Sequence, residues 1–170
     1  MNKIFVEENG IYQIDLSETV NVVENLNEKY KSIGSFFADV DWIAETNEEV
    51  FLIEYKNNTV KNATKVDADY FEKNLKTEKF RVKLLNKYYG STFYILAWQI
   101  NKPINYICII EIEILDSVLP KLIWSKIKKR LPYELQKNRE ITANLIKDFK
   151  ILSIKEWNEQ YPMFPLTKVK

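Results

Sequence analysis

Two hydrophobic runs separated by a short polar segment form the clearest pattern in the chain. The runs, residues 36–45 and 50–57, are rich in branched aliphatic and aromatic side chains, whereas residues 46–49 between them are polar. Such runs favour strands, and a short polar segment between two of them favours a tight turn. The pattern therefore predicts a β-hairpin in which Glu45 pairs with Val50.

Charged residues interrupt one face of this hairpin. Side chains two residues apart on a strand share a face, which applies to Asp39 and Asp41 on the first strand. The predicted register places Asp41 opposite Glu54 and Asp39 opposite Lys56. Two carboxylates about 5 Å apart repel by roughly 3 kcal/mol at an effective dielectric constant of about 20. We therefore expect a cation there, and Mg²⁺ suits the place because it binds one or two carboxylates together with waters and substrate phosphates.

The N-terminal part of the chain predicts a second hairpin followed by a helix. Residues 3–6 and 11–16 have strand character, and Asn9-Gly10 between them is a strong signal for a two-residue turn. Residues 18–31 are expected to form a helix, because their apolar residues recur at helical spacing.

The later part of the chain predicts alternating helices and strands. The expected elements are helices at 68–89, 120–130 and 140–148, and strands at 92–99, 106–115 and 150–154. Gly90 is expected to end the long helix, since glycine is common just beyond a helix C-terminus. The apolar stripe of that helix is expected to contain Phe71, Leu75, Val82, Leu85 and Tyr89. Glu111 is expected on the solvent face of an edge strand, and the aromatic tail from Trp157 is expected to pack over the domain.

These elements indicate an α+β fold in which helices flank a mixed central sheet, an α/β/α sandwich-like arrangement. The length of 170 residues suits one domain with a sizeable core, so residues 1–170 are interpreted as a single domain. The longest apolar runs are far too short to span a bilayer, so no contact with a membrane is expected.

The composition excludes several kinds of chemistry. The chain contains no histidine, which rules out Ser-His and Cys-His catalysis and His-ligated zinc sites. Its one cysteine, Cys108, lies in an apolar run and is expected to be a buried structural thiol. No disulfide can form within the chain, which suits the cytoplasm. Glu7 and Glu8 follow the first residue closely, so we expect no signal peptide.

Charge is unevenly distributed along the chain. Residues 1–60 hold twelve acidic and four basic residues, and residues 61–170 hold 21 basic and twelve acidic ones. An acidic part could hold metal beside a basic part that holds phosphate, although a random distribution of surface charge explains the same numbers. Four lysines form a stripe along the long predicted helix, namely Lys76, Lys79, Lys83 and Lys87. Aligned lysines suit contacts to a nucleic-acid backbone, and the alternative is a solvated helix face.

An acid on one strand is followed thirteen residues later by Glu-x-Lys on the paired strand, and then by a long helix. This arrangement resembles the PD-(D/E)XK nuclease superfamily, which includes many restriction endonucleases and Holliday-junction resolvases. The resemblance covers residues 17–99 and implies a restriction-endonuclease-like fold. It implies that Asp41 and Glu54 bind metal, and that Lys56 orients or activates the attacking water.

Two further acids are candidates for metal binding. Asp39 is an alternative to Asp41 or an additional ligand. Many members of the superfamily use a glutamate on the helix before the hairpin, a place that Glu24 fits, with Glu28 second. The chain departs from the family in having Val40 rather than proline before the acid. It also leaves little room, between the predicted helix and the hairpin, for the strand that the family core has there.

The resemblance implies a Mg²⁺- or Mn²⁺-dependent endonuclease or exonuclease that hydrolyses phosphodiester bonds, with DNA as the expected partner. The resemblance is also compatible with a homodimer, because related enzymes often dimerise to cut two strands. One alternative is an inactive nuclease-like fold that binds a protein or a nucleic acid, as an immunity protein or a mobile-element accessory protein would. Another is an unrelated α+β domain in which Asp39 and Asp41 form surface salt bridges, for example with Lys56. That alternative would be supported if Asp41 and Glu54 faced solvent at an open sheet edge.

Overall fold

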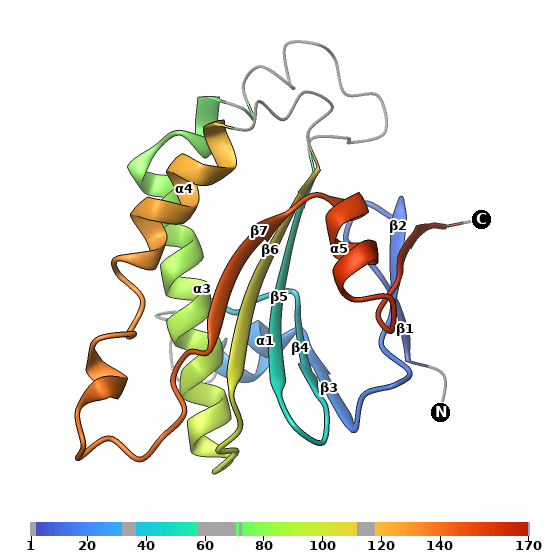
Figure 1. The fold of residues 1–170 in the computed structure, drawn as a ribbon. Coiled ribbons are helices and arrows are strands. Elements are labelled where there is room, and N and C mark those ends of the chain that lie inside the picture. Colours follow the sequence, from blue (N-terminus) through green and yellow to red (C-terminus); the bar gives the residue numbers. More distant parts are fainter. Residues whose placement is uncertain (1–2, 32–36, 58–70, 72, 112–117, 170) are drawn as a thin grey trace.

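The computed structural model describes residues 3–31, 37–57, 71, 73–111 and 118–169 (Figure 1). Within these residues the chain forms a five-stranded sheet, a three-stranded sheet and four α-helices. The predicted α+β class, with a mixed sheet flanked by helices, is therefore confirmed.

The five-stranded sheet is the centre of the molecule, with the strand order β3-β4-β5-β6-β7. Its strands are β3 (Asn21–Glu24), β4 (Trp42–Glu45), β5 (Val50–Asn57), β6 (Ile104–Glu111) and β7 (Asp148–Leu152). The first three strands are antiparallel to one another, whereas β6 is parallel to β5 and β7 is parallel to β6. The chain crosses from β5 to β6 and from β6 to β7 through helices, as parallel pairing requires.

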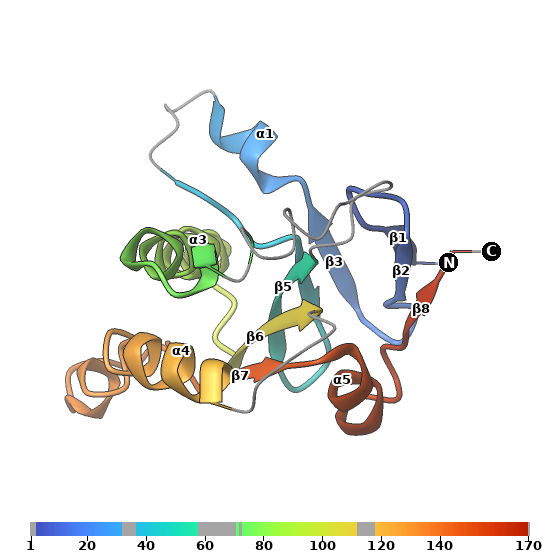
Figure 2. The same ribbon diagram turned by 90° about the horizontal axis from the view of Figure 1, so that it is seen from above.

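Helices cover both faces of this sheet (Figure 2). One face packs against α3 (Glu78–Ala97) and α4 (Val118–Lys128), and the other packs against α5 (Ile154–Gln160). The short helix α1 (Leu26–Tyr30) follows β3, and a 3₁₀ helix (Leu135–Lys137) follows α4.

The three-stranded sheet joins the two ends of the described chain. It consists of β1 (Ile4–Val6), β2 (Tyr12–Asp15) and β8 (Leu166–Lys168) in the order β1-β2-β8, all antiparallel. The predicted N-terminal hairpin is thus confirmed, but the predicted two-residue turn at Asn9-Gly10 is wrong, because the Glu7 amide donates to the Tyr12 carbonyl and a longer connection joins the strands. Gly10 in this connection has the positive φ of 69° that glycine accommodates without strain. The predicted packing of the C-terminal tail is also confirmed, since Trp157 is fully buried.

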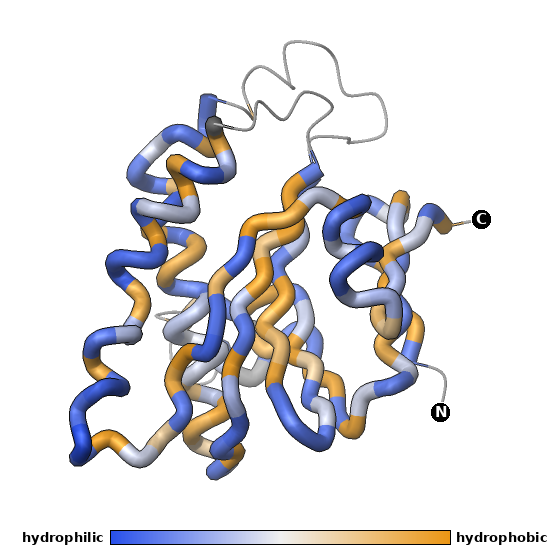
Figure 3. The backbone as a smooth tube through the Cα atoms, in the orientation of Figure 1, coloured by the Kyte–Doolittle hydropathy of each residue, from blue (hydrophilic) through white to orange (hydrophobic). Residues whose placement is uncertain are grey.

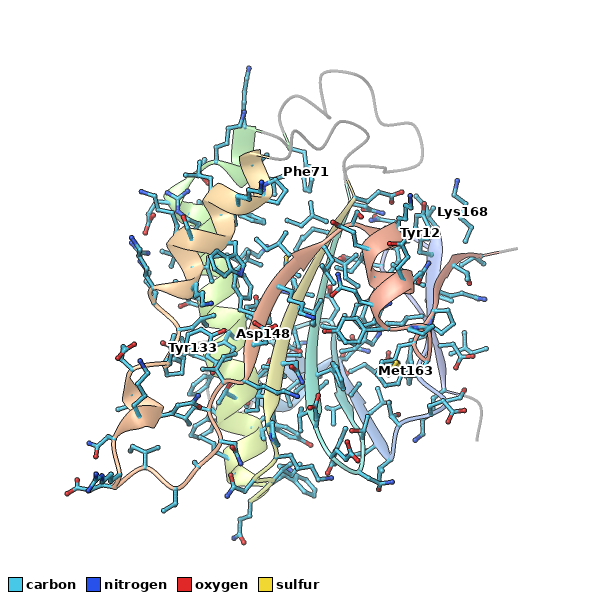
Figure 4. The ribbon with its side chains drawn as sticks, in the orientation of Figure 1. Tyr12, Phe71, Tyr133, Asp148, Met163 and Lys168 are labelled. Atoms are coloured by element: carbon cyan, nitrogen blue, oxygen red, sulfur yellow. The ribbon has the colours of Figure 1, made fainter. Side chains whose placement is uncertain are left out.

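Two hydrophobic cores lie on the opposite faces of the central sheet, whose strands are largely hydrophobic (Figure 3). Side chains fill the space between the layers (Figure 4). Alternate residues of β5 contribute to each core, with Leu52 on the side of α3 and Ile53 on the side of α5. Because β5 and β6 are covered on both faces, almost all of their residues are buried. A charged residue placed there must therefore have a specific partner.

The helix predicted at residues 18–31 is wrong. Residues 21–24 form the edge strand β3, and Asn25 adopts a positive φ of 52° before the short helix α1 begins. Val22 and Val23 are β-branched and pair with β4, a partner that lies about twenty residues away in the sequence. Tertiary pairing therefore overrides the helical spacing of the apolar residues.

The helix end predicted at Gly90 and the strand predicted at residues 92–99 are also wrong, because α3 continues through Gly90 to Ala97. A Cβ atom on Gly90 would clash with the carbonyl oxygen of Ala38. The next residue, Ser91, accepts a hydrogen bond from the Val40 amide at 3.0 Å. The glycine thus allows α3 to approach the segment before β4 closely, instead of ending the helix.

The apolar stripe predicted for the long helix is confirmed in part, since Leu75 and Leu85 are buried and Phe71 packs against the same core, whereas Val82 and Tyr89 are exposed. The buried face of α3 also contains Phe80, Leu84 and Tyr88, and beyond Gly90 also Ser91 and Ile95. The helix begins after Thr77, whose hydroxyl accepts from the Phe80 amide and caps it. Residues 68–70 and 72 of the predicted helix lie outside the described residues.

The C-terminal predictions are mixed. The strands predicted at 106–115 and 150–154 and the helix at 120–130 correspond to β6, β7 and α4, although residues 112–117 lie outside the described residues. The helix predicted at 140–148 is wrong, because residues 140–147 form a loop. The Gln136 side chain accepts from the amides of Leu145 and Ile146 and donates to the Ile146 carbonyl. These bonds satisfy backbone groups that a helix would otherwise pair.

Candidate active site

The hairpin formed by β4 and β5 has the predicted register. Glu45 pairs with Val50 and Trp42 pairs with Ile53, so the next step along the ladder brings Asp41 to the level of Glu54. The first strand is shorter than predicted, since Asp41 directly precedes β4, and Phe36 lies outside the described residues. The opposition of two carboxylates that the sequence pattern predicts is thus present in the fold.

Asp41 is held by the backbone of the neighbouring strand. Its Oδ2 atom accepts a hydrogen bond from the Tyr55 amide at 2.7 Å, and its Oδ1 atom lies 3.5 Å from Lys87 Nζ. The side chain is 33% exposed. One oxygen is therefore fixed against β5, and the other is oriented toward a cation near solvent.

Glu54 is fully buried, with no exposed side-chain surface. Its Oε1 atom lies 2.6 Å from Lys56 Nζ, and its Oε2 atom lies 2.8 Å from Lys87 Nζ. Burial and the charge of Asp41 raise the pKa of Glu54 above its ordinary value, against the opposing effects of the two lysines. Glu54 lies on an interior strand, which contradicts the alternative in which Asp41 and Glu54 face solvent at an open sheet edge.

Lys56 is the third member of the predicted motif. Burial lowers the pKa of Lys56, but the charges of Glu54 and Asp41 outweigh this effect, so its pKa lies above the ordinary value. A metal ion next to Lys56 would disfavour its ammonium form, whereas the carboxylates that surround Lys56 here favour that form. In this arrangement Lys56 is a charged group and not a proton acceptor.

Lys87 is the residue whose position the sequence pattern did not reveal. It was predicted to contact a phosphate backbone, and it instead lies between Asp41 and Glu54, with a side chain that is only 12% exposed. Its ammonium completes a group of two carboxylates and two lysines. Its position follows from which face of α3 is buried, because Lys87 borders the face that contains Leu84 and Tyr88.

A groove of about 610 Å³ opens beside these residues. Its lining includes the predicted site residues Glu24, Asp39, Asp41, Lys56, Lys83 and Lys87. Three of the acids that line it come from the end of β3 and the segment before β4, and Glu7 and Glu8 add two more from the connection after β1. Two of the lysines come from α3, so that side of the groove is basic and could hold a phosphate beside a metal ion at the acids.

The two additional acids occupy different positions from those expected. Asp39 is buried and lies before the paired part of β4, so the predicted ladder pairing with Lys56 is not formed. Burial, followed by the charge of Asp39, raises the pKa of Tyr30 to about 12. Glu24 ends β3 instead of lying on a helix, yet it lines the groove. Glu28 is exposed and does not line the groove.

The predicted lysine stripe divides into two pairs. Lys83 and Lys87 line the groove, one helical turn apart on α3. Lys79 is exposed one turn further toward the N-terminus, and Lys76 is exposed in the turn that precedes the helix. Lys76 and Lys79 are not among the residues that line the groove. Only the inner pair is thus placed beside the carboxylates.

The opposite face of β5 forms a separate polar cluster. Tyr55 is buried there as predicted, and its hydroxyl donates to Glu111 at 3.0 Å. The Tyr12 hydroxyl from the small sheet donates to the same carboxylate at 2.7 Å. The expectation of an edge strand at Glu111 is wrong, because β6 lies between β5 and β7. Cys108 is buried as expected, and burial raises the pKa of its thiol.

The donor atoms are compatible with a hard divalent cation. A single positive group, Lys87 Nζ, already contacts carboxylate oxygens of both Asp41 and Glu54. Mg²⁺ prefers such oxygens and takes waters and phosphates for its remaining positions, so two carboxylates are sufficient. Within the described parts of the chain, no group of three or more Asp, Glu or Cys side chains is arranged to hold a metal ion. The protein residues could therefore supply only part of a coordination shell.

None of the helices in the described ranges is both long and apolar enough to cross a membrane. Comparisons of the chain with protein-family models, with curated proteins and with solved structures found no match. The functional interpretation therefore depends on the geometry of the site.

Proposed function

We propose that the protein is a divalent-metal-dependent nuclease of the PD-(D/E)XK type. The observation that carries this proposal is the meeting of Asp41 and Glu54 around one positive group, with Lys56 beside them at a groove. Two opposed carboxylates and a lysine on the same face of a hairpin are the features that the superfamily uses for phosphodiester hydrolysis.

The order of the strands supports the proposal. The acid precedes β4, Glu-x-Lys lies on β5, and α3 then leads to the parallel strand β6. The strand that the family core has before the acid-bearing strand corresponds to β3, which pairs with β4. The difference is that α1 follows β3 instead of preceding it. A restriction-endonuclease-like core with a displaced helix accounts for this arrangement.

The chain's own residues suit the steps of hydrolysis. Mg²⁺ or Mn²⁺ bound here would lower the pKa of a coordinated water and stabilise charge on the phosphate. Asp41 has one oxygen anchored by the Tyr55 amide, so its free oxygen is already oriented. Glu54 is buried, where electrostatic interactions are strong. Lys56 remains charged and can neutralise negative charge that develops on the phosphate.

The lysines of α3 support a polyanionic substrate, and DNA remains our proposal. Lys83 lines the groove beside the carboxylate cluster, and Lys79 lies one turn beyond it. A helix rises 1.5 Å per residue, so lysines four residues apart are about 6 Å apart along its axis. Such a row suits successive contacts along a nucleic-acid backbone.

The test is a cleavage assay on labelled single- and double-stranded DNA and RNA, with Mg²⁺ or Mn²⁺ and with a chelator. We expect Asp41→Asn and Glu54→Gln to reduce metal-dependent cleavage by on the order of 100-fold or more, because each removes a charged ligand. Glu45→Gln is the matched control, since Glu45 lies at the other end of the same hairpin and pairs with Lys102. Circular dichroism shows whether each variant is folded.

Folded variants of Asp41 and Glu54 that cleave as fast as the unmodified protein would overturn this proposal. Cleavage that persists in excess chelator would do the same. A loss of cleavage in Glu45→Gln equal to that in the two site variants would show that the effect is not specific to the site.

A second function, binding without catalysis, is favoured by one observation. The charges of two carboxylates and two lysines cancel, so the cluster is neutral without a metal. A nuclease-like fold of this kind would bind a protein or a nucleic acid as an immunity or mobile-element accessory protein. Calorimetry with Mn²⁺ in the presence of a cleavage-resistant DNA strand separates the two functions, because a binding module would show no metal uptake at millimolar Mn²⁺ even with nucleic acid bound.

A further inference from the structure

Lys87 occupies the place that a metal ion would take. Its Nζ atom lies 2.8 Å from Glu54 Oε2 and 3.5 Å from Asp41 Oδ1, and these are the oxygens proposed to bind metal. The other oxygens are already engaged, Glu54 Oε1 by Lys56 and Asp41 Oδ2 by the Tyr55 amide. A metal ion that binds both carboxylates must therefore compete with one particular lysine.

We infer that Lys87 is an exchangeable cation, which keeps metal out of the site until a substrate phosphate draws its ammonium group away. This inference rests on the proposed nuclease function and concerns its regulation. An ammonium group and a divalent ion cannot occupy the same space, and close to each other they repel. Metal binding therefore requires Lys87 to move.

The structure provides a place to which Lys87 can move. The residue lines the groove, and its flexible four-carbon stem allows the ammonium group to change partners. Lys83 lines the same groove one turn away, so a phosphate near Lys83 lies within the range of both lysines. A phosphate in the groove would offer Lys87 a new partner and leave the two carboxylates to the metal.

Lys56 does not fill the same role. Its ion pair within the described ranges is with Glu54 Oε1, and it comes from the same strand as Glu54, so it neutralises the carboxylate without lying between the two acids. Lys87 comes from a different element, α3, and contacts both acids. The competition with metal is therefore assigned to Lys87 specifically.

Competition and exchange have a reciprocal consequence. If a phosphate backbone releases Lys87 and thereby strengthens metal binding, metal must strengthen binding of the backbone by the same factor. Free protein would then bind metal weakly and would acquire it together with its substrate. This coupling depends on Lys87, so its removal would leave a site that binds metal without substrate.

The test is calorimetric titration of the full chain with Mn²⁺ in the absence of nucleic acid. We expect Lys87→Met to bind Mn²⁺ at least ten-fold more tightly than the unmodified protein, because methionine keeps the stem and removes the competing charge. Lys83→Met is the matched control, since it removes one charge from the same helix and groove without touching the carboxylates. We expect its Mn²⁺ affinity to stay within about two-fold of the unmodified value.

The second measurement is the affinity for a short phosphorothioate DNA strand, followed by fluorescence anisotropy with and without Mn²⁺. We expect Mn²⁺ to strengthen binding at least ten-fold in the unmodified protein and less than three-fold in Lys87→Met. Lys87→Gln, which keeps a hydrogen-bond donor for Glu54, replaces the methionine variant if that variant does not fold.

Two results would overturn the inference in distinguishable ways. Equal, measurable Mn²⁺ affinity in the unmodified protein and in the folded Lys87 variants would show that Lys87 does not compete, while the proposed nuclease function would stand. No Mn²⁺ uptake by any of the proteins at millimolar metal would overturn the proposed metal dependence, and the inference with it.

Discussion

The two ends of the β4–β5 hairpin both contain carboxylates next to lysines, but they are built differently. At the turn, Glu45 pairs with Lys102 at 2.6 Å and Glu49 pairs with Lys147. Each acid there has its own lysine, and both pairs keep contact with solvent. Such pairs contribute little to stability, because solvent screens them and the side chains lose freedom when they pair.

At the open end of the hairpin, one lysine is shared by two acids. Lys87 contacts both Asp41 and Glu54, and Glu54 has no exposed surface. Burying charges is costly, and well-packed apolar residues often provide equal or greater stability. The two ends therefore differ in burial and in sharing: each acid at the turn has one partly exposed lysine, whereas the open end keeps a carboxylate fully out of water between two lysines.

The largest expected effect comes from breaking the contact that positions the open end. Gly90→Ala should destabilise the protein by about 3 kcal/mol, because the added methyl group clashes with the backbone at Ala38 and α3 cannot pack closely. Urea denaturation measures this change. Gly10→Ala is the comparison, since its methyl group meets nothing within 4 Å and strains only the positive φ, at a cost of about 1 kcal/mol. A smaller cost at Gly90 than at Gly10 would contradict this account of α3.

A smaller effect is expected from removing one lysine at each end of the hairpin. Lys56→Met should reduce the free energy of unfolding by about 2 kcal/mol, because it leaves the buried Glu54 with one cation instead of two. Lys102→Met at the turn should cost less than about 1 kcal/mol. Denaturant titration at neutral pH measures both. Equal costs would remove the distinction between the two ends.

The smallest effect concerns Glu111, a further carboxylate near the open end. Burial, followed by the hydrogen bond to Glu111, raises the pKa of Tyr12 from 10.0 to about 12. Between these values the unfolded chain has lost the Tyr12 proton and the folded chain has kept it, so stability falls as pH rises. Tyr12→Phe should lose stability less steeply between pH 10 and 12 in denaturant titrations. An unchanged slope would show that Tyr12 does not contribute.

Much of the hairpin was predictable because its determinants are local. The turn fixes which residues face each other, and the alternation of side chains then places Asp41 against Glu54. The same local reasoning predicted the N-terminal hairpin and the presence of strands at β6 and β7, but not the parallel pairing of those two strands. The predicted elements needed only short-range pattern and turn chemistry.

The rest depended on contacts between distant segments. Gly90 signals a helix end by its local preference, but its close approach to Ala38 decides its role. The error shifted the expected inward face of α3 and hid the position of Lys87. Residues 21–24 likewise become a strand only because β4 lies beside them. The incorrect predictions thus occur where a partner far along the chain determines the structure.

The hydrogen bond from the Tyr55 amide to Asp41 has a consequence for engineering. The peptide group between Glu54 and Tyr55 orients Asp41, so this support is independent of the side chain at position 55. Every residue except proline provides that amide. The side chain of Tyr55 meanwhile belongs to the opposite face of the sheet, with Glu111. The core on that face of β5 can therefore be repacked while the backbone contact that orients Asp41 stays in place.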